Sequence, residues 1–170
     1  GGLAMTYAVL SDYSNRLTPG DAELRSLDAA QRALALDPTA AEPLLAMGNV
    51  AGKTGRRQTA AALLRRAIEL RPSSATAHQW LGTTLVEMGN IEDGIASPKR
   101  AAELDPRSLI VASNLASMLS IAGRDKEAIA ACLPTLEYAP DAILCSSVIG
   151  LSYLILGDRD RARPLFDRWA

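Results

Sequence analysis

The stretch PSSATAHQWLGTTLVEMGNIEDGIASPKRAAELDP, residues 72–106, decides the fold of this chain. Its terminal prolines, Pro72 and Pro106, belong to a series of four that stand 34 residues apart, with Pro38 before them and Pro140 after. Proline cannot continue a helix, so each one is expected to follow a helix end. A strict repeat of this length indicates stacked helix–turn–helix units rather than one closed core.

Glycines and apolar residues repeat with the same period. One series is expected to form the tight turns between paired helices, where a positive φ favours glycine: Gly55, Gly89, Gly123 and Gly157. A second series lies among apolar residues and is expected where two helix backbones nearly touch: Gly48, Gly82, Ala116 and Gly150. Between these positions the apolar spacing is helical, as in Leu81, Leu85 and Met88.

These motifs resemble the tetratricopeptide repeat (TPR) family. The last unit contains Ile149-Gly150, Tyr153 and Ala162-x-x-x-Phe166, and an earlier one contains Trp80-Leu81-Gly82, Leu85 and Pro106. The resemblance implies an all-α fold, a right-handed alpha-alpha superhelix of about ten helices that forms a single TPR domain over 1–170. Its units are a degenerate repeat at 4–40, repeats at 41–74, 75–108 and 109–142, and a truncated repeat at 143–170. A narrower resemblance, carried by residues 33–38 and 75–80, is to TPR regions of bacterial multidomain regulators.

Three prolines depart from the pattern, because Pro98, Pro134 and Pro164 lie inside predicted second helices. A proline within a helix removes a hydrogen bond and clashes with the preceding turn, at a cost of about 3 kcal/mol. We therefore expect these helices to be kinked or locally frayed.

Catalytic and metal-binding residues are scarce. The one histidine, His78, falls where the family has a packing aromatic, and we expect it to be partly buried. Neither a metal-ligand spacing nor a nucleophile–histidine–acid set can be assembled around it, so we expect no cofactor, no metal and no enzymatic activity. The 18 basic and 19 acidic residues are interspersed, which argues against nucleic acid as a partner. No apolar run is long enough to insert into a membrane. The compartment is left open, cytoplasmic or periplasmic.

Two cysteines, Cys132 and Cys145, fall on neighbouring predicted helices. We expect two buried free thiols. A disulfide is the alternative if the protein is exported.

The family resemblance places the first helix of each pair on a concave wall where ligands dock. This implies a peptide-binding groove formed by Leu45, Asn49, Gln79, Trp80, Thr83, Glu87, Asn114, Ser117, Val148, Leu151 and Ile155. The wall is polar in the middle and apolar toward its C-terminal end. Leucine and isoleucine stand where related carboxylate-binding repeats have cations, so capture of a peptide C-terminus is disfavoured.

The chain ends before the last repeat is complete, and we expect Phe166 and Trp169 to project toward a missing helix, where they could support self-association as a homodimer. The leading hypothesis is a non-catalytic scaffold that binds a peptide or helix and belongs to a larger bacterial regulatory protein. One alternative is a structural or oligomerisation element that packs against its own chain or another copy. Another is a sensor that binds a small effector in the groove.

Overall fold

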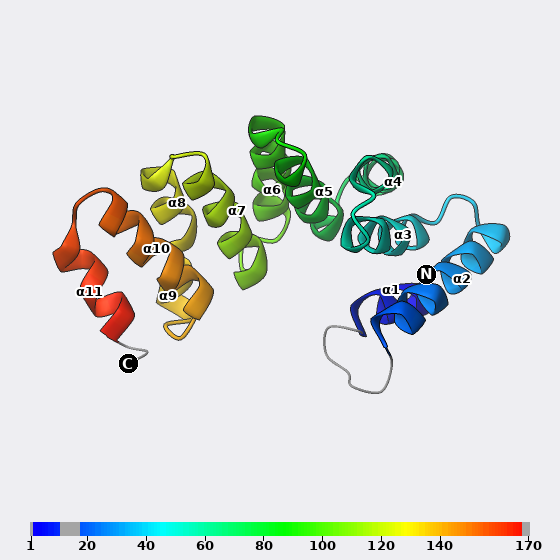
Figure 1. Cartoon of the computed structure of the whole chain (residues 1–170), viewed down its shortest axis with the longest axis horizontal. Helices are drawn as coiled ribbons and strands as arrows, with labels where there is room; N and C mark the ends of the chain where they lie inside the picture. The colour runs from blue at the N-terminus through cyan, green and yellow to red at the C-terminus, as the bar shows by residue number, and fades with distance from the viewer. Residues whose placement is uncertain (1, 11–17, 168–170) are drawn as a thin grey trace.

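The computed structural model of the chain describes residues 2–10 and 18–167, and within these ranges it contains helices and no strand. The helices are α1 (Gly2–Leu10), α2 (Pro19–Leu36), α3 (Ala41–Lys53), α4 (Arg57–Leu70), α5 (Ala75–Glu87), α6 (Ile91–Leu104), α7 (Leu109–Ile121), α8 (Asp125–Cys132), α9 (Thr135–Tyr138), α10 (Ile143–Ile155) and α11 (Arg159–Asp167). They follow one another along an open arch, with α1 and α2 at one end and α11 at the other (Figure 1). The all-α solenoid predicted from the sequence is confirmed.

The turns within the last four helix pairs share one geometry. Gly55, Gly89, Gly123 and Gly157 have φ values of 75°, 84°, 72° and 82°, as predicted. The residue after each glycine donates its N–H to a carbonyl five residues earlier; one example is Arg56 to Ala51, at 2.8 Å. This arrangement satisfies carbonyls left free at a helix end and turns the chain sharply. The next helix is thereby directed back along the first.

The paired helices touch where the second glycine series predicted. A Cβ atom added to Gly48 would lie 2.9 Å from Cγ of Leu64, and one added to Gly82 would lie 2.4 Å from Cδ of Pro98. One added to Gly150 would lie 2.7 Å from Cζ of Phe166. Each small residue therefore meets the side chain 16 positions later. The same spacing relates Ala116 to Cys132, and both are fully buried in one core cluster.

Only one of the three internal prolines interrupts its helix. Helices α6 and α11 run through Pro98 and Pro164, so fraying at these two positions is not observed. At Pro134 the prediction is confirmed, because α8 ends at Cys132 and α9 begins at Thr135. This interruption raises the described helices above the expected ten. Pro98 is tolerated because its ring fills the contact with Gly82, while no equivalent glycine faces Pro134.

The hydrophobic core is divided along the arch instead of being gathered at one centre. One cluster joins α1, α2 and α3 around Ala30 and Val50. A second joins α3, α4 and α5 around Leu64 and Leu81, and a third extends from α6 to α10. This distribution is typical of a solenoid, in which each unit packs on its neighbours only. None of the described helices is long and apolar enough to cross a bilayer.

Candidate functional site

A polar pocket lies between the first helices of successive pairs. It has a volume of about 350 Å³ and is bounded by α3 and α5, with Asn114 contributed by α7. Six of the residues predicted for the groove line it together: Asn49, Gln79, Trp80, Thr83, Glu87 and Asn114. The pocket is completed by Gly48, Gly52, Lys53, Leu64 and Thr84. The two glycines were not predicted as site residues, although an apolar helix face with no side chain at two positions is a signal for a hollow.

Helical spacing explains why four of these side chains come from one helix. Gln79, Trp80, Thr83 and Glu87 recur at three- and four-residue intervals along α5, so they share one face. The helix is started by Ser74, whose hydroxyl accepts a hydrogen bond from the N–H of Ala77 at 3.2 Å. The opposite face carries Leu81 and Leu85, which are buried in the core. Burial of these leucines fixes the rotation of α5 and turns the polar face toward the pocket.

One polar atom of the pocket has no partner within the described structure. Oδ1 of Asn49 is buried and accepts no hydrogen bond. Leaving a buried acceptor unsatisfied costs roughly 1–3 kcal/mol. A ligand that donates an N–H or O–H at this point would recover that free energy.

The hydroxyl and carboxylate groups nearby already have partners. Thr83 donates to the carbonyl of Gln79 at 3.3 Å, within α5. Glu87 forms an ion pair with Arg57, the first residue of α4, with 3.0 Å between Oε2 and Nε. The negative charge at this end of the pocket is therefore neutralised. The pocket offers amide groups and an indole ring rather than an unbalanced charge.

The C-terminal part of the inner wall is apolar. We define the apolar stripe as Leu144, Val148, Leu151 and Ile155, which recur at helical spacing along α10. Leu151 is 52% exposed and Ile155 58% exposed, while Val148 is half-buried against the core. Ser117 of α7 donates its hydroxyl to the carbonyl of Ser113 at 2.8 Å, so this hydroxyl is already engaged within its own helix.

Two predicted site residues occupy other environments. Leu45 is only 4% exposed and packs with Leu64 and Leu81 between α3, α4 and α5, so it belongs to the core and does not line the pocket. The ring of Phe166 lies over Gly150 and forms the contact between α10 and α11, although 39% of the residue is exposed. It is therefore not a freely projecting end residue. Trp169 lies outside the described residues.

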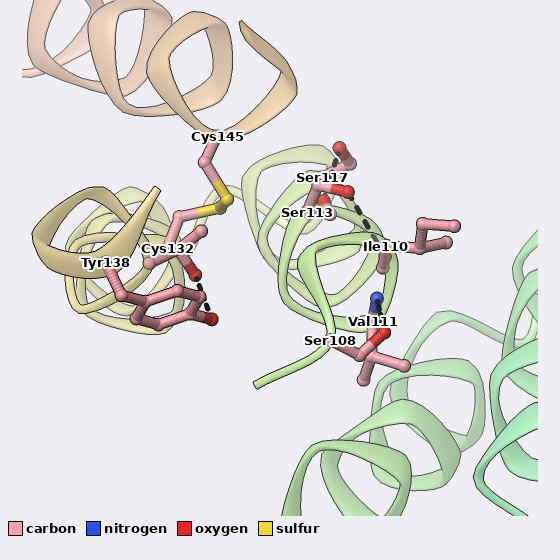
Figure 2. Close-up of a disulfide and its surroundings, with 9 residues drawn as sticks. Ser108, Ile110, Val111, Ser113, Ser117, Cys132, Tyr138 and Cys145 are labelled. Carbon is pink, nitrogen blue, oxygen red and sulfur yellow. Dashed lines mark hydrogen bonds between the residues drawn. A yellow bond between two sulfur atoms is a disulfide. The ribbon is translucent and has the colours of Figure 1, made fainter. Parts of the chain in front are cut away.

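The remaining groups examined for chemistry serve packing or cross-linking. His78 is half-buried, as expected, with Nε2 at 3.0 Å from the carbonyl oxygen of Pro72. Cys132 and Cys145 are joined in a disulfide, so the expectation of two free thiols was wrong (Figure 2). Their separation of 13 residues does not by itself reveal that the Cα atoms lie 5.3 Å apart, within the range a disulfide needs. Across the described residues, no cluster of three His, Cys, Asp or Glu side chains could hold a metal ion.

Comparisons with known proteins agree with this geometry. A family profile described as tetratricopeptide repeat matches residues 45–85, and no curated protein sequence matches the chain. The crystal structure of MamA is 27% identical, with a TM-score of 0.76 over 87% of this chain and 86% of that one. MamA (41 to its end) from Desulfovibrio magneticus RS-1 is 18% identical, with a TM-score of 0.76 over 99% of this chain and 93% of that one. YrrB, described as a TPR protein with an unusual peptide-binding site, is 22% identical, with a TM-score of 0.71 over 96% of this chain and 81% of that one. The fold is that of a TPR solenoid.

Proposed function

We propose that this TPR-type solenoid is a non-catalytic scaffold that holds a peptide or helix of a partner protein against the inner faces of α3, α5, α7 and α10. The observation that carries the proposal is the convergence of six predicted groove residues on one pocket, with an unpartnered acceptor on Asn49. The similarity in fold to YrrB, described as having a peptide-binding site, supports the same class of ligand.

The side chains of the pocket suit a peptide main chain. Oδ1 of Asn49 can accept a peptide N–H, and the carboxamides of Gln79 and Asn114 can each donate and accept. The indole of Trp80 offers a broad surface for a partner side chain, and tryptophan is enriched among residues that dominate binding. Lys53 is the single cation of the lining, so the pocket is not proposed to capture a terminal carboxylate.

The apolar stripe would hold the continuation of the same ligand. A helix or extended segment that fills the pocket near Trp80 could place apolar side chains against Leu151 and Ile155. The preferred ligand is therefore amphipathic, with a polar part over α5 and an apolar part over α10.

The repeat boundaries at 41–74, 75–108, 109–142 and 143–170, with a degenerate unit at 4–40, are part of this proposal, as is membership of a larger bacterial regulatory protein. The helix pairs supply the support for the boundaries. For example, α5 and α6 together occupy 75–104 and end just before Pro106. The regulatory context rests on the sequence resemblance alone.

One observation favours a second candidate, self-association. The apolar surface of α10 is not confined to the stripe, because Ile143 is 53% exposed and Leu154 and Leu156 are each 45% exposed. An exposed apolar surface of this kind is typical of a protein interface. A second copy of the chain would then cover α10.

The two candidates are separated by selecting peptides from a random library on the intact chain and measuring their affinity by fluorescence polarisation. Trp80→Ala and Leu151→Asp are expected to weaken binding at least tenfold. Leu24→Asp is the matched control, because Leu24 is 68% exposed on α2, away from the pocket. Light scattering of the same variants reports the oligomeric state. Peptide affinity that is unchanged in both groove variants would refute the scaffold proposal, and a change of mass in Leu151→Asp alone would support self-association.

A further inference from the structure

A disulfide lies at the one interrupted helix of the described arch. Cys132 is the last residue of α8, and Cys145 is the third residue of α10. The sulfur–sulfur bond crosses directly from one helix to the other (Figure 2). Both cysteines are fully buried, at 0% and 1% exposed.

The same positions are occupied by apolar residues at the other junctions between helix pairs. Shifting Cys132 and Cys145 by the repeat of 34 residues leads to Pro98 and Val111 at one junction and to Leu64 and Ala77 at the junction before it. All four of these side chains are buried. Leu64 and Ala77 belong to the same core cluster, so that junction is held by apolar packing alone.

Helix continuity differs between the junctions as well. After Leu64, α4 continues to Leu70, which gives the next helix pair an uninterrupted surface to pack on. After Cys132 the helix stops, and only the four-residue α9 follows the break at Pro134. Helical segments this short are not stable by themselves and depend on tertiary contacts. The junction with the least helical support is the one that carries the covalent bond.

We propose that the Cys132–Cys145 disulfide is a structural cross-link that substitutes for apolar packing at the last junction and makes the order of α8 and α10 depend on an oxidising compartment. The bond forms when the two thiols lose two protons and two electrons to the disulfide of an oxidoreductase or of oxidised glutathione. That disulfide is reduced to two thiols in the exchange. Such bonds persist in oxidising compartments and are rare where glutathione keeps thiols reduced.

Burial distinguishes this bond from a rapid redox switch. Reduction requires a thiolate to reach one of the sulfur atoms, and both cysteines are enclosed by the core cluster of α6 to α10. The bond can therefore be attacked only after α8 and α10 separate. Reduction of the native chain should be slow and should become fast in denaturant.

The bond itself is tested on chain exported to a bacterial periplasm and alkylated in denaturant without reductant. No Lys or Arg lies between residues 127 and 158, so trypsin leaves both cysteines in one peptide. Additional cleavage after Glu137 separates them, and the expected product is a pair of peptides that stays linked until reductant is added. Two alkylated cysteines in the exported chain would overturn the proposal.

The structural role is tested by hydrogen exchange of the intact chain with and without reductant. Opening of the 13-residue loop should raise exchange in α8 and α10 on the order of 100-fold, while α3 to α6 keep their protection. The Cys132→Ala/Cys145→Ala variant should behave like the reduced chain and should not respond to reductant. Unchanged protection of α10 after complete reduction, or an equal loss across α3 to α6, would overturn the local role assigned to the bond.

Discussion

Replacing Gly82 by alanine tests the closest approach between two helices in this chain. The added Cβ would lie 2.4 Å from Cδ of Pro98 and 2.7 Å from the carbonyl oxygen of Gly94. Carbon atoms in contact prefer about 3.5–4.0 Å, so α5 and α6 would have to separate by roughly 1 Å. Neither a proline ring nor a backbone carbonyl can rotate out of the way.

The expected magnitude follows from two opposing effects. Overpacking of a core typically costs about 1–3 kcal/mol, and alanine recovers about 1 kcal/mol relative to glycine inside a helix. The net loss should be about 1–2 kcal/mol. For a chain of this size that corresponds to a Tm lower by roughly 2–8 °C. The change is measured by thermal melting of the helical circular dichroism signal at 222 nm.

Gly52→Ala provides the matched control on α3. Its added Cβ would lie 3.9 Å from the nearest atom, Cβ of Ala60, which is an ordinary contact. This variant should melt at the same temperature as the parent chain or slightly higher. A Gly82→Ala variant as stable as Gly52→Ala would refute the argument that the glycine series exists to let the helices touch.

Three further predictions concern the pocket, the interrupted helix and pH. Asn49→Ala removes the unpartnered acceptor, so stability should stay constant or rise by up to about 1 kcal/mol while affinity for selected peptides falls at least tenfold; a lower Tm would contradict this reading. Pro134→Ala restores a backbone donor at a residue whose φ of −61° and ψ of −24° are helical, and it should raise both the signal at 222 nm and the unfolding free energy, by about 1–3 kcal/mol; no change in either would contradict it. The hydrogen bond from Arg124 lowers the pKa of Glu127 below its ordinary value of 4.5, so its stabilising effect is present above that value and is lost as the pH falls through the lower folded value. The Tm advantage of the parent chain over Glu127→Gln should thus be constant from pH 6 to 8 and shrink toward pH 3, and an advantage that persists at pH 3 would contradict it.

The helices, their turns and their closest contacts were predictable from the sequence because each depends on the local preference of one residue type. A positive φ strongly favours glycine, so Gly55 and Gly89 mark turns wherever they occur. A backbone contact needs a residue without a large side chain, and this requirement makes Gly48 and Gly150 recognisable. The period of 34 residues then orders these local signals into a solenoid.

The groove was predicted in part, because helical spacing shows which side chains share a face but not how far the helix is rotated. The buried leucines of α5 set that rotation so that Trp80 and Thr83 face the pocket. The same packing on α3 buries Leu45, which spacing alone assigned to the wall. A small change in rotation about the helix axis would exchange these environments.

The sequence by itself determined the repeating architecture and the positions at which helices begin, turn and touch, since these depend on backbone conformation and on residue size. Only the tertiary structure decided that Cys132 and Cys145 are joined and that Phe166 covers Gly150. It also decided which polar atom of the pocket lacks a partner. Such outcomes depend on distances and directions between side chains on different helices, and no single helix encodes them.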